Sequence, residues 1–113
     1  MTRLARFLAV PLLALAGTAA FANEAFEARI AELERLGIEA HWRESARRID
    51  ALEPHLDALS PEQRVRVEFV RLRSLGLAGR EEEALDGFTA LLQREMPAAL
   101  RLRTLTTAIT VAA

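Results

Sequence analysis

Apolar residues recur at steps of three or four positions along this chain, which is the periodicity of helices that bury one face. Over 24–36 the repeating residues are Phe26, Ile30, Leu33 and Leu36. Comparable stripes predict further helices over 39–53, 61–78 and 81–95 and from Pro97 onward. Only five Gly and four Pro occur in 113 residues, and such a composition favours helices over strands. The sequence therefore predicts an all-α fold.

Several residues mark where these helices begin and end. Ser60 and Gln63 form a capping-box pattern in front of the third predicted helix. Pro54 is expected to end the second helix, because proline lacks the backbone donor and clashes with the preceding turn. Gly37 is expected to end the first helix. Residues 54–59 then form a connector with at most one further helical turn.

A shift of 39 positions places the third and fourth predicted helices on the first and second. The step Leu75-Gly76 then falls on Leu36-Gly37. This shared step is the informative part, because any two amphipathic helices match at some shift. The offset predicts two helical hairpins stacked as a repeat array. The predicted units are a hairpin over 23–59, a hairpin over 60–97 and the first helix of a third unit over 98–113.

The second predicted hairpin carries the pattern of a known repeat. Ala84 and Phe88 are a small residue and an aromatic residue four positions apart, and Gly79 precedes their helix. With the Pro after that helix, this segment resembles the second half of a tetratricopeptide repeat (TPR). Leu72 and Leu75 replace the glycine and the aromatic residue of the first half, and the first hairpin matches more loosely. The resemblance implies a short α-solenoid of TPR-like hairpins.

The N-terminus has the features of a secretory signal peptide. Arg3 and Arg6 precede an apolar run over 7–16, and Ala20 and Ala22 place small residues where signal peptidase requires them. The uncharged stretch is shorter than the roughly 20 residues that a membrane-spanning helix needs. We therefore expect residues 1–22 to be a signal peptide and the mature chain to be periplasmic. The alternative is an uncleaved membrane anchor.

The composition excludes several classes of function. All 15 basic residues are Arg, and 16 acidic residues balance them to a net charge of −1, so the chain lacks the basic excess of a nucleic-acid-binding protein. The absence of Cys excludes disulfides, thiol catalysis and an N-terminal lipid anchor. His41 and His55 have no metal-ligand spacing. We expect no catalytic, metal or cofactor site; a small exported enzyme or inhibitor with a site between helices is the alternative.

The TPR resemblance implies that the third predicted helix contributes to a concave peptide-binding groove. In that register the groove residues are Arg66, Phe69 and Arg73. Two guanidinium groups about two turns apart can bind a peptide carboxylate or acidic side chains through bidentate hydrogen bonds. The alternative is that these arginines form ordinary surface ion pairs, which contribute little. The acids available for such pairs are Glu62, Glu68 and the glutamates at 81–83.

The whole arrangement is similar to the extracytoplasmic sensory region of bacterial membrane signalling proteins, notably diguanylate cyclases. This resemblance implies a non-catalytic module for protein or peptide interaction, forming the N-terminal sensory or scaffold part of a larger protein. The alternative is a stand-alone periplasmic adaptor in envelope assembly. The chain ends inside an apolar helix, without the polar cap that repeat arrays need, and we expect a fragment; otherwise that helix caps the stack or forms a dimer.

Overall fold

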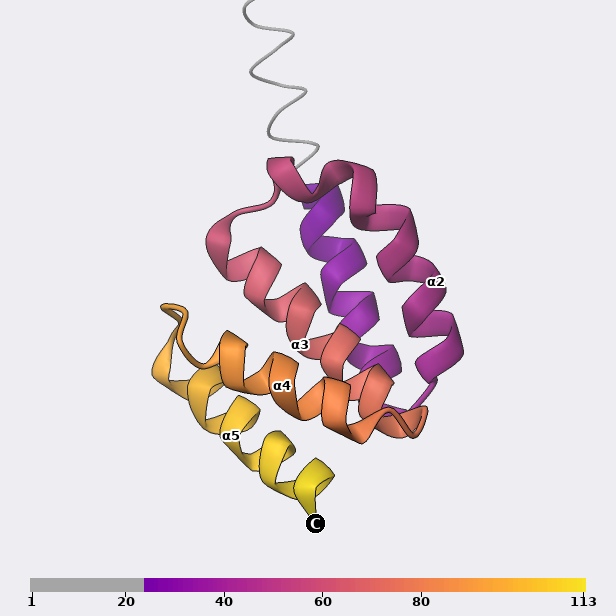
Figure 1. Ribbon diagram of the computed structural model, residues 1–113. Helices are drawn as coiled ribbons and strands as arrows, with labels where there is room; N and C mark the ends of the chain where they lie inside the picture. Colours follow the sequence, from indigo (N-terminus) through magenta and orange to yellow (C-terminus); the bar gives the residue numbers. More distant parts are fainter. Residues whose placement is uncertain (1–23) are drawn as a thin grey trace, which may run out of the picture.

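The computed structural model describes residues 24–113 (Figure 1), and the predicted signal peptide at 1–22 lies outside them. Within this range the chain is entirely helical and turn, without strands, so the all-α prediction is confirmed. The elements are a helix over 24–38, α2 (Trp42–Leu52), the 3-10 helix η1 (Glu53–Ala58), α3 (Pro61–Leu77), α4 (Glu81–Leu91) and α5 (Ala98–Ala112). No helix among these residues is long and apolar enough to cross a membrane.

The start of α3 is formed as the sequence predicts. The backbone N–H of Gln63 donates to Ser60 Oγ at 3.1 Å, and the N–H of Ser60 donates to Gln63 Oε1 at 2.9 Å. This capping box satisfies donors that an isolated helix end leaves unpaired. Upstream, α2 gives way at Glu53 to η1, which occupies most of the predicted connector.

Two turns in the chain have the same geometry, 39 positions apart. Ala40 follows the 24–38 helix with φ of 60°, and Gly79 follows α3 with φ of 87°. In both turns the next residue, His41 or Arg80, donates its N–H at 2.9 Å to the carbonyl five positions back. This is the Schellman type of helix end. The helices that follow, α2 and α4, each have 11 residues and begin and end 39 positions apart.

The prediction that Gly37 ends the first helix is wrong. Gly37 lies within the helix, and a Cβ built there would meet Val70 of α3 at 3.6 Å. A Cβ on Gly76, its counterpart, would lie 3.1 Å from Val111 of α5. The repeated glycine therefore marks a close crossing of helices, and the left-handed Ala40 ends the helix instead.

The fourth predicted helix also ends earlier than expected, at Leu91 rather than near residue 95. The chain turns there to bring α5 back against α3 and α4. The guanidinium of Arg101 donates to the carbonyl oxygens of Leu92 at 2.7 Å and Arg94 at 3.0 Å. These side-chain bonds satisfy carbonyls that would otherwise accept from a continuing helix.

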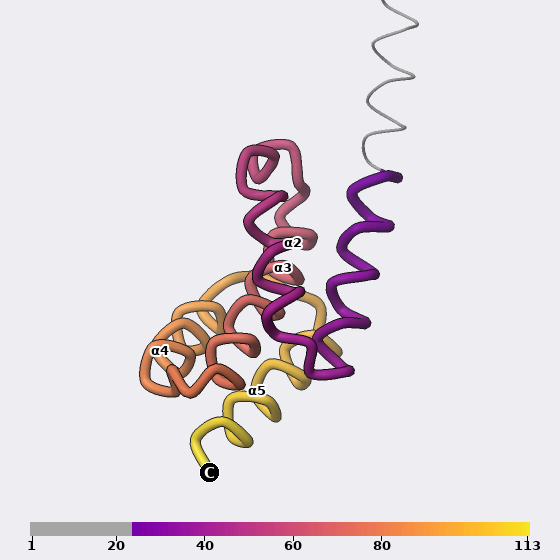
Figure 2. Tube along the Cα trace, turned by 90° about the vertical axis from the view of Figure 1, so that its right-hand side faces the viewer, coloured from indigo at the N-terminus to yellow at the C-terminus, as the bar shows by residue number. Residues whose placement is uncertain are grey.

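The central helix is α3, which packs against α2, α4 and α5. Figure 2 shows the 24–38 helix and α4 on opposite sides of it. Its sequence carries apolar residues on two faces; Val65 and Leu72 are buried on one face and Val67 and Val70 on the other, whereas Leu77 near the C-terminal end is 46% exposed. The helix is therefore enclosed on two sides, as a helix with two apolar faces requires.

On α5 only one side is covered. Leu100 and Thr104 are buried against the rest of the molecule. The opposite side exposes Leu102, Leu105 and Ile109, with 66, 42 and 68% of their surface accessible. The sequence predicts this exposure, because no further helix follows within the described residues to cover these side chains.

Candidate functional site

Arg66 is held by two carboxylates of the first helix. Its Nη1 lies 2.5 Å from Glu27 Oε1, and its Nη2 lies 2.5 Å from Glu34 Oε1. Its side chain retains only 18% exposure. Its Nε and Nη2 donate to Glu34 and its Nη1 donates to Glu27, so Arg66 ties α3 to the 24–38 helix through all three of its nitrogens. Its partners lie in the neighbouring hairpin, not among the acids expected from the sequence.

This ion pair changes how its members titrate. The hydrogen bond from Gln63, followed by that from Arg66, lowers the pKa of Glu27 below its ordinary value. The hydrogen bond to Glu34 is the largest cause of the raised pKa of Arg66. Both shifts favour the charged forms, so the contact persists at neutral pH.

Phe69 belongs to the core, and its position differs from the open groove implied by the TPR resemblance. Its ring is 5% exposed. It packs edge-on against Phe88 of α4, with ring centroids 6.0 Å apart and an interplanar angle of 63°. The guanidinium carbon of Arg103 lies 5.7 Å from the Phe69 ring centroid. The ring therefore joins α3, α4 and α5 through stacking and cation–π contacts.

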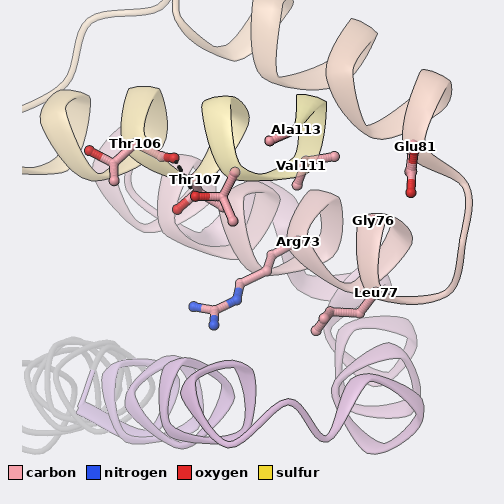
Figure 3. A pocket seen from close by; sticks show the side chains of 9 residues that line it. Arg73, Gly76, Leu77, Glu81, Thr106, Thr107, Val111 and Ala113 are labelled. Carbon is pink, nitrogen blue, oxygen red and sulfur yellow. Dashed lines mark hydrogen bonds between the residues drawn. The ribbon is translucent and has the colours of Figure 1, made fainter.

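Arg73 differs from both of these residues. It is half-buried, and it forms no hydrogen bond or ion pair with any residue in 24–113. It lines a cavity of about 370 Å³ between α3 and α5. In Figure 3, Arg73 and Leu77 extend from α3 and Thr107 from α5, and the guanidinium of Arg73 is directed away from Glu81. The cavity walls are formed by Arg73, Gly76, Leu77, Glu81, Thr106, Thr107, Thr110, Val111 and Ala113.

The charges around Arg73 leave it uncompensated. Arg73 also lines an adjoining small hollow whose acid, Glu34, is bound by Arg66 and lies 3.7 Å from Arg103. Glu81 lines the large cavity and forms no ion pair among the described residues. The cavity therefore carries a cation, an anion and an apolar wall that includes Leu77. Such a set suits a peptide segment better than a single small ion.

Only one of the three predicted groove residues thus lines a sizeable cavity. The α5 residues of this cavity, including Thr107 and Val111, were not predicted. The helical repeat was the one sequence signal for their position. Successive first helices of such an array lie side by side, which places α5 next to α3. The sequence did not show which face of α5 would turn toward Arg73.

The other polar residues considered from the sequence lie apart from this cavity. His41 lies 3.4 Å from Glu39 at the first turn, and His55 packs against Phe26 with ring centroids 5.5 Å apart. Within 24–113, no group of three His, Cys, Asp or Glu residues is placed to hold a metal ion. No protein-family model, curated protein or solved structure matches the chain.

Proposed function

We propose that this chain is an exported, non-catalytic TPR-like module that binds a peptide segment of a partner protein in the cavity between α3 and α5. In the same proposal, the module is the N-terminal sensory or scaffold part of a larger bacterial membrane signalling protein of the diguanylate cyclase type. The signal-peptide pattern and the family resemblance support that placement. The peptide-binding role rests on the geometry around Arg73.

The observation that carries the peptide-binding role is the uncompensated guanidinium of Arg73. Every other arginine on α3 is engaged: Arg64 donates to backbone carbonyls, Arg66 pairs with the 24–38 helix and Arg71 pairs with Glu68. A half-buried cation without a partner gains most from an incoming anion, because a charge-assisted hydrogen bond is stronger where water is partly excluded.

The peptide would present a carboxylate to Arg73, either its C-terminus or an acidic side chain. Two parallel N–H donors of a guanidinium match the two oxygens of a carboxylate. The adjacent apolar wall at Leu77 and Val111 would take an aliphatic side chain of the same peptide. Glu81 at the other end of the cavity would favour a basic residue there.

The repeated turn geometry supports the assignment to a TPR-like array. Both hairpins end their first helix on a left-handed residue and continue into helices of equal length. The glycines at the helix crossings allow successive first helices to approach closely. In this arrangement the 24–38 helix, α3 and α5 form one face, on which the cavity lies. A solenoid built from such units presents its ligand surface along that face.

The test is a screen of the full chain against an array of peptides synthesised with a free C-terminal carboxylate and, in parallel, as amides. Binding should require a carboxylate, and Arg73→Ala should weaken it about tenfold or more. Arg94→Ala is the matched control, since Arg94 forms no side-chain hydrogen bond among the described residues and does not line this cavity. The absence of any bound peptide, or equal binding by Arg73→Ala, would contradict the proposal.

A further inference from the structure

A second cavity, of about 340 Å³, lies in the first hairpin, between the 24–38 helix and the α2–η1 segment. Arg29 and Leu33, four positions apart, line it from the first helix. The residues from the other side are Arg48, Ala51, Leu52 and His55. Their spacing of three, four and seven positions places them on one helical face. Three exposed, nitrogen-bearing side chains, those of Arg29, Arg48 and His55, therefore line one cavity from two helical segments.

The Phe26 ring contacts two of these side chains, those of Arg29 and His55. The guanidinium carbon of Arg29 lies 6.0 Å from its centroid, and the His55 ring centroid lies 5.5 Å from it. Apart from this ring contact, Arg29 has no partner among the described residues. Its donors are therefore available to a ligand, while the aromatic contact restricts where its planar group can lie.

Arg48 is only partly engaged. Its Nε donates to Glu44 at 3.2 Å, and its two terminal nitrogens donate to no residue in 24–113. Glu44 divides its charge between Arg48 and Arg47, whose Nη2 lies 2.7 Å away. A nearby acid of the first helix, Glu32, is held by Arg35. The cavity therefore has an excess of positive charge.

At the equivalent place in the second hairpin, a leucine side chain lies directly against the neighbouring helix. Gly87 stands 39 positions after Arg48, and a Cβ built on it would lie 2.0 Å from Leu72 Cδ2. Leu72, the counterpart of Leu33, thus packs directly on the α4 backbone. In the first hairpin Arg48 stands at the position equivalent to this glycine and lines the cavity. The buried side chains of Leu33 and Leu52 close its floor.

We propose that this cavity binds a small organic phosphate monoester. A phosphate monoester presents three oxygens and close to two negative charges, which matches two guanidinium groups and an imidazole better than a carboxylate does. The volume exceeds that of phosphate alone, and the apolar floor accommodates the organic group. This site lies in the first hairpin, apart from the cavity between α3 and α5 that Arg73 lines. The phosphate-binding proposal therefore does not depend on the peptide-binding proposal.

The experiment is calorimetric titration of the full chain with phenyl phosphate, inorganic phosphate and benzoate at constant ionic strength. Phenyl phosphate should bind about tenfold more tightly than either of the other two probes. Arg29→Gln and Arg48→Gln should each weaken its binding about fivefold or more. Arg43→Gln, on α2 but outside the cavity, and Arg73→Ala should each change it less than about twofold.

Each other outcome overturns a part of the proposal. Equal binding of benzoate would assign the cavity to carboxylates, and equal binding of inorganic phosphate would remove the role of the apolar floor. Unchanged affinity in Arg29→Gln or Arg48→Gln would place the ligand elsewhere, and absence of phenyl phosphate binding would leave no phosphate site here. Circular dichroism of each variant verifies that its helix content is unchanged, so that a lost affinity reports the site.

Discussion

The two hairpins share one backbone design and differ in how their helices meet. Both use the same left-handed turn, at Ala40 and at Gly79, and both continue into a helix of 11 residues. In the second hairpin Gly87 lets Leu72 pack against the α4 backbone. In the first, Arg48 occupies that position and a cavity remains. The turn is therefore retained while the helix interface diverges.

This difference shows which part of a helical repeat tolerates change. A turn that ends a helix is specified by a left-handed residue and by backbone hydrogen bonds, and few side chains take part. The interface between two helices is specified by side-chain volume at the crossing. Replacing glycine with a long side chain at that crossing can separate the helices locally and create space that a ligand can use.

The largest expected difference concerns the equivalent leucines, which are both fully buried. Leu72→Ala should lower the free energy of unfolding by about 4 kcal/mol and Leu33→Ala by about 2 kcal/mol, both within the range for such truncations. Leu72 loses direct packing on the α4 backbone, whereas Leu33 already borders a cavity. Urea unfolding of both variants measures this, and equal losses would remove the distinction between the two interfaces.

The next comparison replaces the two equivalent residues at the helix crossings, Gly87 and Arg48, with alanine. Gly87→Ala should destabilise by about 1–2 kcal/mol, because forcing buried Leu72 to move costs more than the helix gains from alanine. Arg48→Ala should change stability by less than about 0.5 kcal/mol, since it removes only an exposed ion pair. Thermal unfolding of the two variants tests the pair. If Gly87→Ala raised the stability instead, the interface between α3 and α4 would have space for an added methyl group.

The two turns should respond to substitution with opposite signs. Gly79→Ala should destabilise by about 1 kcal/mol, because alanine is disfavoured at positive φ. No atom lies within 4 Å of the Cβ it would gain, so the cost comes from the backbone alone. Ala40→Gly should stabilise by about 0.5 kcal/mol, since relief of the same strain exceeds the added flexibility of the unfolded chain. Changes of the same sign would mean that the two turns differ.

The smallest expected effect is a pH dependence from the contact between Arg66 and Glu27. Because the pKa of Glu27 is lowered in the folded state, its stabilisation is present above pH 4.5, the usual value, and is lost as the pH falls through the folded pKa. Arg66→Gln should make the fall in stability below that pH shallower, by less than about 0.5 kcal/mol, because the half-exposed carboxylate is screened by water.

The double variant Arg66→Gln/Glu27→Gln provides the control for this pH dependence. The slope of its stability against pH should change no more than in Glu27→Gln alone. Glu27→Gln removes the carboxyl group whose titration is measured, so Arg66→Gln has no further effect on that slope. Urea midpoints measured between pH 3 and pH 6 for the four proteins complete the cycle. If Arg66→Gln left the slope of stability against pH unchanged, the lowered pKa of Glu27 would be due to its hydrogen bond from Gln63 alone.

Local signals in the sequence predicted local structure well. Ser60 and Gln63 lie three positions apart, so their capping box could be recognised without knowing the fold. The two apolar faces of α3 likewise predicted that this helix is enclosed. The end of the first helix was misassigned to Gly37, because glycine serves both as a helix terminator and as a crossing residue, and spacing alone does not separate these roles.

The candidate sites were harder to predict, since they depend on contacts between helices. Arg66 pairs with Glu27 and Glu34, which lie 39 and 32 positions away, whereas the sequence suggests Glu62, Glu68 and the glutamates at 81–83 as partners. Phe69 was assigned to a groove by its register, but its ring fills the space beside Phe88. The hairpin cavity around Arg48 depends on side-chain volume at a crossing, for which helical periodicity has no signal.

A methyl-resolved nuclear Overhauser spectrum of the full chain compares the two helix interfaces directly. We expect strong cross-peaks between the methyl groups of Leu72 and the α-protons of Gly87. Between the methyl groups of Leu33 and the α-proton of Arg48, which line the cavity, we expect a much weaker cross-peak. Cross-peaks of equal strength in both hairpins, or a missing contact between Leu72 and Gly87, would show that the two interfaces do not differ in this way.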